Sequence, residues 1–312
     1  MVMLMDKTYH FIVNTHSRTG KAQQIWDRLE SILRSRGVSY QVYITEYVHH
    51  ATELATAITA GEEPVYLVTC GGDGTVNEVL NGIRDLSKVV FGYSPLGSAN
   101  DFARGLSLSG EPEQILQDIL DSREEHAIDI GQVSWQGGSR RFVISAGAGI
   151  DAMVCRRALT SKLKTFLNHF HLGSLTYGLL TISSLFQAPF VHGEVLTEEG
   201  EHYTMPKAIF TAAMNFPWEG GGVPMAPRAS ATDGRLSVCC VYGIPRLLCL
   251  LCFPFLLAGK HEKIKGFDVV NATELTVTFD KPMVVHADGE DCGDQLEVTF
   301  SAMPNVLRMP VL

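Results

Sequence analysis

Long hydrophobic runs are scarce in this chain of 312 residues, which limits how it can relate to a membrane. The most apolar segment, residues 247–258, is shorter than the roughly 20 residues that a transmembrane helix needs, and Pro254 interrupts it. The first ten residues contain Asp6 and Lys7 but no long apolar stretch, so no signal peptide is expected there. We therefore expect a cytoplasmic protein that is at most peripheral to a membrane.

An excess of positive charge and a cysteine framework are also missing. The formal net charge is −9, which argues against adsorption of the whole molecule on nucleic acid or on an anionic membrane, so any such contact must come from a local patch and no nucleic-acid partner is expected. The seven cysteines are odd in number and lack framework spacing, as in proteins of a reducing compartment. Cys249 and Cys252 have no second pair to complete a metal site, so positions in a helix core are the better interpretation.

The hydrophobic patterns divide the chain into two parts. Strand and helix patterns alternate up to about residue 124, which predicts a parallel sheet with helices on both sides. Strand-like runs dominate after that point, among them residues 141–146, 274–279 and 283–286, and helical patterns appear only around residues 152–185 and 245–257. We therefore predict an α/β domain over residues 1–126 and a β-rich domain over residues 127–300.

A glycine-rich turn is the strongest local feature. An apolar strand pattern at residues 64–70 leads into Gly-Gly-Asp-Gly, and a helical pattern begins at Thr75, which has capping-box spacing to Glu78. Glycine lets a ligand approach the backbone closely, and the N–H groups at a helix N-terminus favour phosphate. Residues 71–75 are thus predicted to bind phosphate, with a ligand-free strand-to-helix turn as the alternative. Neither a Walker A nor a Gly-x-Gly-x-x-Gly pattern is present, which excludes the usual P-loop and dinucleotide sites.

A second glycine-bearing loop, residues 95–104, follows the next strand pattern. Loops after neighbouring parallel strands meet at the carboxyl edge of the sheet, where ligands bind. Ser98 could offer a hydroxyl to phosphate, and Asp73 and Asp101 could together hold a hydrated Mg²⁺. The loop after the first strand would meet them there with two side chains suited to phosphate contacts, Ser17 and Arg18.

The two loops together resemble the diacylglycerol kinase catalytic family. They read Gly-Gly-Asp-Gly-Thr-Val-Asn-Glu over residues 71–78 and Pro-Leu-Gly-Ser-Ala-Asn-Asp-Phe-Ala-Arg over residues 95–104. The first motif is shared with NAD kinases, and loosely with phosphofructokinases, whereas the second selects lipid kinases. The chain is most similar to the soluble bacterial group, which includes diacylglycerol kinase and phosphatidylglycerol kinase relatives. Three later motifs extend the resemblance over nearly the whole chain: Asn215 with Gly220–Gly222, Asp233-Gly234, and Asp288-Gly289-Glu290.

This resemblance implies an N-terminal α/β nucleotide-binding domain like that of NAD kinase and phosphofructokinase, and a C-terminal β-rich sandwich domain. Residues 301–312 would return to the first domain. ATP would be the phosphoryl donor, and the acceptor would be a lipid alcohol, such as diacylglycerol, at a membrane surface. Glu290 matches the general base, with Asp73 as a second catalytic residue and Asp288 as an alternative base. Nucleotide contacts would fall on Asn14, Thr15, His16, Ser17, Arg18, Thr45, Gly71, Gly72, Asp73, Gly74, Thr75, Val76, Asn77, Glu78 and Ser98.

Magnesium is the cofactor that the resemblance implies, at two places. Acidic groups of a water-bridged Mg²⁺ network would be Asp73, Asp101 and Asp129. A structural Mg²⁺ site would use Ser230, Asp233 and Arg235, the first and last through backbone carbonyls. The chain departs from the family pattern in its first loop, which reads Asn-Thr-His-Ser-Arg where Asn-Pro-x-Ser-Gly is usual, and at Ser98, where threonine is usual.

Other interpretations stay open on the sequence. A kinase of a soluble substrate, such as NAD, and a catalytically inactive nucleotide- or lipid-binding regulator are the two alternatives. Residues 247–257 lie between Arg246 and a run of lysines, so they could dock at a lipid surface or form a core helix. The identity of the lipid and the oligomeric state, with a homodimer among the options, are also open.

Overall fold

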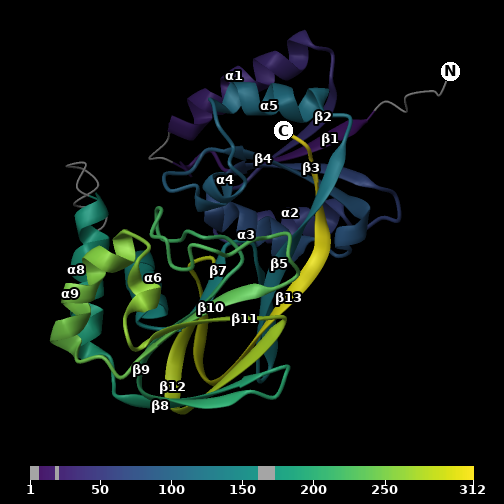
Figure 1. The fold of residues 1–312 in the computed structure, drawn as a ribbon. Coiled ribbons are helices and arrows are strands. Elements are labelled where there is room, and N and C mark those ends of the chain that lie inside the picture. Colours follow the sequence, from purple (N-terminus) through teal and green to yellow (C-terminus); the bar gives the residue numbers. More distant parts are fainter. Residues whose placement is uncertain (1–6, 18–20, 161–172) are drawn as a thin grey trace. The chain divides into compact units, whose positions relative to one another are not determined.

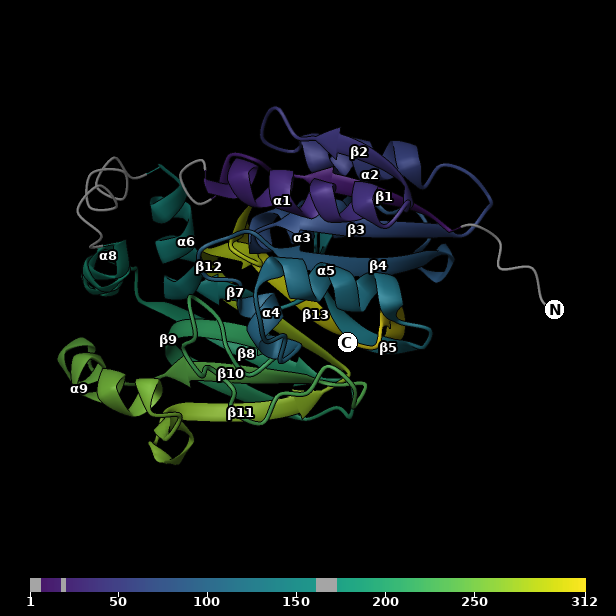
Figure 2. The same ribbon diagram turned by 90° about the horizontal axis from the view of Figure 1, so that it is seen from above.

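The computed structural model describes residues 7–17, 21–160 and 173–312, which form two compact units (Figures 1 and 2). The first unit comprises residues 1–130, 220–222 and 304–312, and the second comprises residues 131–219 and 223–303. The chain passes from one unit to the other within strands β5 (Glu125–Trp135) and β13 (Glu290–Pro310).

The first unit is built on a parallel sheet in the order β13-β4-β3-β1-β2. Its remaining strands are β1 (Thr8–Val13), β2 (Ser39–Ile44), β3 (Val65–Gly71) and β4 (Val89–Pro95). Helices cover both faces of the sheet, α1 and α5 on one and α2 and α3 on the other (Figure 1). These helices are α1 (Lys21–Ser35), α2 (His50–Ile58), α3 (Asp73–Gly82) and α5 (Pro112–Asp121). The central strands are apolar along their length because both of their faces are buried.

The strands of the second unit are antiparallel, and its hydrophobic core lies between the faces of the sheet. Its strand order is β11-β10-β9-β7-β12-β13, with β8 paired to β9 and β12, and β6 paired to β5. The strands are β6 (Gly138–Phe142), β7 (Ser145–Gly149), β8 (Val191–Thr197), β9 (His202–Met214), β10 (Leu236–Tyr242), β11 (Phe267–Ala272) and β12 (Glu274–Ala287). Buried and exposed residues alternate along β8, as expected for a strand with one face on the core.

In its described residues the second unit has three α-helices, α6 (Ile150–Thr160), α8 (Gly173–Gln187) and α9 (Arg246–Leu257). The helical pattern expected over residues 152–185 is present as α6 and α8, and residues 161–172 lie outside the described part. In the part of the chain that the structure describes, no helix combines the length and the apolar character needed to cross a bilayer.

Two expectations about the strands of the second unit are wrong. The run expected as a single strand over residues 141–146 is divided between β6 and β7 by a turn at Val143 and Ile144. The two runs expected at residues 274–279 and 283–286 form one strand, β12, whose register with β13 shifts between Thr278 and Met283. Side-chain alternation cannot show either event, because both depend on contacts with distant parts of the chain.

Close packing of α2 against α3 yields a testable prediction for the first unit. A Cβ atom added at Gly82 would lie 2.3 Å from the carbonyl oxygen of Thr52, which is a backbone atom that cannot turn away. We expect Gly82→Ala to lower the free energy of unfolding by about 1–3 kcal/mol, measured by urea denaturation. Gly61→Ala is the control, because no atom lies within 4 Å of a Cβ there. Equal stability of the two variants would contradict this packing.

Candidate active site

The glycine turn joins the end of β3 to the start of α3, with Gly72 as the residue preceding the helix. It contacts the loop after β4 backbone to backbone. The N–H of Leu96 donates to the carbonyl of Gly71 at 2.8 Å, and a Cβ at Gly97 would lie 2.5 Å from the Cα of Gly72. Gly97 therefore has no room for a side chain, and a Cβ at Gly72 would lie 3.1 Å from the Cα of Gly97. The predicted meeting of the two loops at the carboxyl edge is present.

Asp73 fixes the relation between these loops. Its carboxylate accepts hydrogen bonds from the backbone N–H groups of Asp101 and Phe102, each at 3.1 Å, at the start of the short helix α4 (Asp101–Gly105). The side chain of Asp101 is only 4% exposed and forms an ion pair with Arg104. It also accepts a hydrogen bond from the N–H of Gly221 at 2.6 Å. The structure thus brings together the two carboxylates expected to hold Mg²⁺, and adds the glycine segment 220–222 to them.

The loop after β1 reaches the same turn through Asn14. Its side-chain amide donates to Oγ1 of Thr75 at 3.1 Å, and its backbone N–H donates to the carbonyl of Cys70 at 2.9 Å. The side-chain oxygen of Asn14 accepts from the N–H of His16, which shapes the loop locally. Three predicted nucleotide-contact loops therefore converge. Arg18, the cation expected there, lies outside the described residues.

Several residues predicted to contact nucleotide use their side chains for the fold. The side chains of Val76 and Asn77 are completely buried. The carboxylate of Glu78 accepts hydrogen bonds from the N–H groups of His49 and Ala51, at the start of α2. The predicted capping box is wrong, since α3 begins at Asp73 and Glu78 caps a different helix. At the turn itself, Gly72 to Gly74 are partly accessible and Ser98 is exposed, so these positions can face a ligand.

The third acidic residue of the expected Mg²⁺ network has a different partner. Asp129 is completely buried in β5 and accepts a hydrogen bond from the N–H of Asn305 in β13 at 2.8 Å. Among the described residues, no three His, Cys, Asp or Glu side chains converge as direct ligands of a metal. The carboxylates of Asp73 and Asp101 are hard oxygen donors at one turn, and this chemistry fits a magnesium ion that keeps several of its waters.

The residues of the expected structural Mg²⁺ site form a turn in the second unit. The carboxylate of Asp233 accepts from the N–H of Arg235 at 3.0 Å, and the hydroxyl of Ser230 lies 3.1 Å from that of Thr232. Asp233 is exposed, and Arg235 donates to the carbonyl of Asn271. This is the geometry of a strand-entry turn, and the metal role of these residues stays a prediction.

The acidic motif near the C-terminus is anchored by Asp288. Its carboxylate accepts three backbone N–H groups, from Val143, Ile144 and Ser145, at 2.8–3.0 Å. Asn215 holds the same turn from the other side, because its amide donates to the carbonyl of Val143 and its N–H donates to that of Ile144. These bonds explain the turn between β6 and β7. They occupy Asp288 structurally, which argues against it as the alternative base.

Glu290 begins β13 two residues after this anchor. Its side chain is 19% exposed, and its carboxylate lies 3.9 Å from the guanidinium of Arg140. The anchored turn fixes the backbone from which Glu290 projects. The role of this residue as a base stays a prediction.

A buried histidine–aspartate pair lies next to this motif and was missed by the sequence reasoning. Nε2 of His286 lies 3.2 Å from Oδ2 of Asp151, and the N–H of Gly289 donates to Nδ1 at 3.1 Å, which leaves the proton of the neutral ring on Nε2. Burial by itself would lower the pKa of His286, but the hydrogen bond and charge of Asp151 outweigh burial and raise it. No local pattern could reveal a pair that is 135 residues apart in sequence.

The hydrogen bond between His286 and Asp151 predicts the direction in which the pKa of His286 shifts. We expect an NMR titration to place the pKa of His286 above its ordinary 6.5, and Asp151→Asn to lower that pKa, because the strongest influence that opposes burial is then removed and only the charges of Glu219 and Asp288 still raise it. A raised pKa in the folded protein means that the stabilisation from the pair is present at low pH and is lost as pH rises through the folded pKa. Thermal unfolding should therefore lose this pH dependence in the variant. A pKa that is indifferent to the substitution would contradict the assignment.

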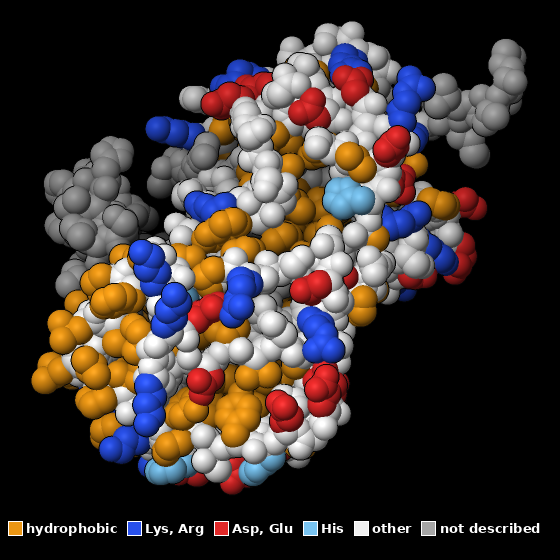
Figure 3. All heavy atoms as spheres, viewed as in Figure 1, with side chains coloured by type: hydrophobic (Ala, Val, Ile, Leu, Met, Phe, Trp, Pro, Cys, Tyr) orange, Lys and Arg blue, Asp and Glu red, His pale blue; other side chains and the backbone are white. Residues whose placement is uncertain are grey.

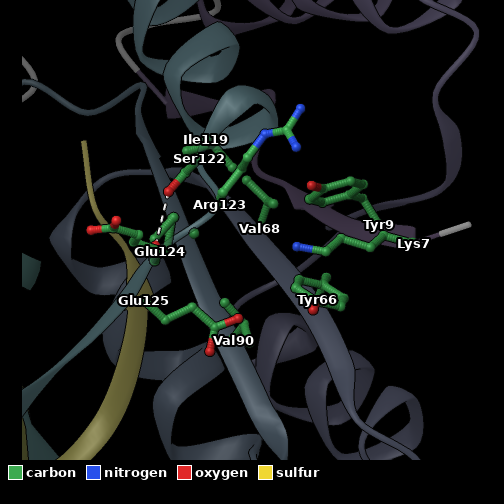
Figure 4. A pocket seen from close by; sticks show the side chains of 12 residues that line it. Lys7, Tyr9, Tyr66, Val68, Val90, Ile119, Ser122, Arg123, Glu124 and Glu125 are labelled. Carbon is green, nitrogen blue, oxygen red and sulfur yellow. Dashed lines mark hydrogen bonds between the residues drawn. The ribbon is translucent and has the colours of Figure 1, made fainter. Parts of the chain in front are cut away.

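A separate hollow lies at the opposite edge of the parallel sheet, near the first residues of the strands (Figure 4). Lys7 extends toward Tyr66, with its amine 4.5 Å from the ring centroid, and Tyr9 and Arg123 also line the hollow. The glycine turn follows the carboxyl end of β3, so this hollow is not the predicted phosphate site.

Two solved structures of kinases share this fold. A diacylglycerol kinase from Bacillus anthracis str. Sterne superposes with a TM-score of 0.74 at 18% identity, over 98% of this chain and 97% of that one. An NAD kinase from Archaeoglobus fulgidus in complex with ATP superposes with a TM-score of 0.53 at 11% identity, over 97% and 93%. The fold is that of these diacylglycerol kinase and NAD kinase structures, which confirms the fold predicted from sequence.

Sequence comparison narrows this fold type to a family. Residues 8–133 match the diacylglycerol kinase catalytic domain, and residues 144–311 match the YegS C-terminal NAD kinase beta sandwich-like domain. The chain belongs to this family of bacterial lipid kinases, as the resemblance of its motifs predicted.

Named relatives cover most of the chain. YtlR of Bacillus subtilis (strain 168), which carries the name of a candidate lipid kinase, is 29% identical over 96% of this chain and 98% of its own length. A diacylglycerol kinase of Mycobacterium tuberculosis (strain ATCC 25618 / H37Rv) is 27% identical over 89% and 86%. A "Probable lipid kinase YegS-like" protein of Chromohalobacter salexigens is 30% identical over 70% and 68%.

Proposed function

We propose that this protein is an ATP- and Mg²⁺-dependent lipid kinase that transfers the γ-phosphoryl group to the hydroxyl of a lipid alcohol, diacylglycerol or a related lipid. The observation that carries the proposal is the locked pair of glycine loops, in which the carboxylate of Asp73 accepts the N–H groups of Asp101 and Phe102. Such a rigid, glycine-lined turn before a helix suits phosphate. Membership of the lipid kinase family supports the acceptor class.

Phosphoryl transfer depends mainly on positioning and charge stabilisation. In this proposal, the backbone of Gly72 to Gly74 and the hydroxyl of Ser98 hold the nucleotide phosphates, and Asp73 and Asp101 hold the hydrated cation. A bound Mg²⁺ supplies positive charge next to the phosphate oxygens. The ion pair with Arg104 keeps the carboxylate of Asp101 oriented in its buried position.

Glu290 is proposed to accept the proton of the lipid hydroxyl as general base. Support comes from its partly exposed side chain and from the neighbouring Asp288, whose carboxylate is held by three backbone N–H groups. The turn is thereby rigid while the next carboxylate can meet a substrate. His286, through its bond with the N–H of Gly289, holds the same turn.

The test is phosphoryl transfer with labelled ATP, Mg²⁺ and a panel of micellar lipid alcohols, with NAD as a parallel acceptor. We expect label in one lipid and a rate at least about 100-fold lower for Glu290→Gln, the usual scale for loss of a general base. Circular dichroism and ATP binding should be unchanged in that variant, because the amide keeps the shape of the side chain. Label in NAD would overturn the acceptor class, and ATP binding without any transfer would favour the regulator alternative.

Contact between the two loops predicts the effect of a single methyl group on nucleotide binding. A Cβ at Gly97 would lie 2.5 Å from both the Cα of Gly72 and Oδ1 of Asn100, so Gly97→Ala must separate the loops. We expect ATP affinity, measured by calorimetry, to fall at least about tenfold, equivalent to about 1.4 kcal/mol. Gly61→Ala, in open space, should bind as the unsubstituted protein does. Normal ATP affinity in a folded Gly97→Ala variant would contradict the assignment of this turn to phosphate.

A further inference from the structure

Helix α9 exposes apolar side chains over most of its surface. Only Cys252 and Leu256 are buried against the second unit, and no charged residue occurs between Leu247 and Ala258. Leu247 is 70% exposed and Leu251 is 67% exposed. The other large apolar side chains exposed on this helix are Leu248, Phe253, Phe255 and Leu257. A core helix would bury such residues, so the core-helix alternative for residues 247–257 holds only for the narrow face that carries Cys252 and Leu256.

The end of α8 and the segment after it continue this surface. Arg246, the first residue of α9, donates to the carbonyl oxygens of Phe186 and Ala188, and its guanidinium lies 4.3 Å from the ring centroid of Phe190. Phe186 and Phe190 are themselves exposed, as is Ile182 one turn earlier. These contacts join the two segments into one feature, here named the α8–α9 apolar surface, which consists of Ile182, Phe186, Phe190, Leu247, Leu248, Leu251, Phe253, Phe255 and Leu257.

Positive charge borders the α8–α9 apolar surface in a protein that is otherwise acidic. Residues 243–266 contain four cations and one anion, Glu262, a net charge of +3, against −9 for the whole chain. Glu262 forms an ion pair with Arg228 at 2.8 Å, so its negative charge is already compensated by a cation other than these lysines. Lys and Arg side chains lie beside the hydrophobic side chains over α9 (Figure 3). The four cations are Arg246, Lys260, Lys263 and Lys265.

We infer that the α8–α9 apolar surface docks the protein on an anionic phospholipid bilayer, with the leucine and phenylalanine side chains in the interface and the lysines at the headgroups. Large exposed apolar patches mark interaction sites, and apolar helix faces with a basic border bind anionic membrane interfaces. A second copy of the chain fits less well, because a two-fold contact would place the same basic border against itself. The inference rests on the proposed function, since it names the place where the lipid substrate is met.

The test measures binding to vesicles without ATP, so it does not depend on catalysis. The wild-type protein should sediment with vesicles of phosphatidylcholine and phosphatidylglycerol more than with phosphatidylcholine alone. The double substitution Leu247→Ser/Leu251→Ser should weaken partitioning at least about tenfold, because each leucine loses several buried apolar carbons. Neutralising Lys260, Lys263 and Lys265 to Gln should remove the preference for the anionic vesicles and its dependence on salt.

A matched control uses two leucines outside the α8–α9 apolar surface. Leu196 in β8 and Leu296 in β13 are about half exposed, at 49% and 52%, and Leu196→Ser/Leu296→Ser should leave vesicle binding unchanged. Thermal unfolding checks that all variants are folded. No vesicle binding by the wild-type protein, or equal losses in the control pair, would overturn the inference. The inference would also be overturned if the wild-type protein were a dimer that does not bind vesicles and that Leu247→Ser/Leu251→Ser converts to monomers.

Comparing two forms of substrate separates this inference from the kinase proposal. With the acceptor lipid dispersed in detergent, the Leu247→Ser/Leu251→Ser variant should transfer phosphate at the wild-type rate, whereas with the same lipid in vesicles its rate should fall about as far as its partitioning. Equal rates of variant and wild type on vesicles would overturn docking and leave the kinase proposal standing. Vesicle binding without transfer to any lipid would overturn the kinase proposal and leave docking standing.

Discussion

The carboxylate of Asp73 is the interaction on which the candidate phosphate site depends. Two N–H groups at the start of α4 would have no partner within that short helix, and Asp73 accepts both of them. Because Asp73 is also the first residue of α3, one side chain fixes the glycine turn and the following loop to each other. The contact between Gly72 and Gly97 is then possible only without side chains. A ligand therefore meets a turn whose shape the protein has already fixed.

The second unit uses the same device at its acidic motif. Asp288 accepts three N–H groups of the turn between β6 and β7, and Asn215 holds the carbonyl groups of that turn. A carboxylate that accepts several backbone N–H groups is worth more than an exposed ion pair, since its partners are rigid and buried. His286, which is hydrogen-bonded to Asp151, also accepts the N–H of Gly289 and so supports the same motif. Glu290 thus projects from a backbone held at several points.

Several predicted site residues turned out to have structural roles because of contacts between distant segments. Glu78 has the spacing of a capping box with Thr75, yet its carboxylate accepts the N–H groups of His49 and Ala51 and so caps α2. Asp129, expected in a metal network, accepts a hydrogen bond from the N–H of Asn305, 176 residues further along the chain, and its metal role stays a prediction. Helix α9 is likewise largely exposed: Cys252 and Leu256 are buried and Cys249 and Leu250 pack partly against the core, whereas its other large apolar side chains are exposed.

The sequence by itself determined the alternation of strands and helices, the change to a β-rich second half and the family, because these depend on local periodicity and on motifs of adjacent residues. It also located the glycine turn, since only glycine permits such close approach of backbones. The tertiary structure decided which acidic side chains cap helices and turns and which can face a ligand, and that the N–H of Gly221 donates to the carboxylate of Asp101. Hydrogen-bond partners of a buried carboxylate are chosen by geometry between segments far apart in the chain, and no local pattern records that geometry.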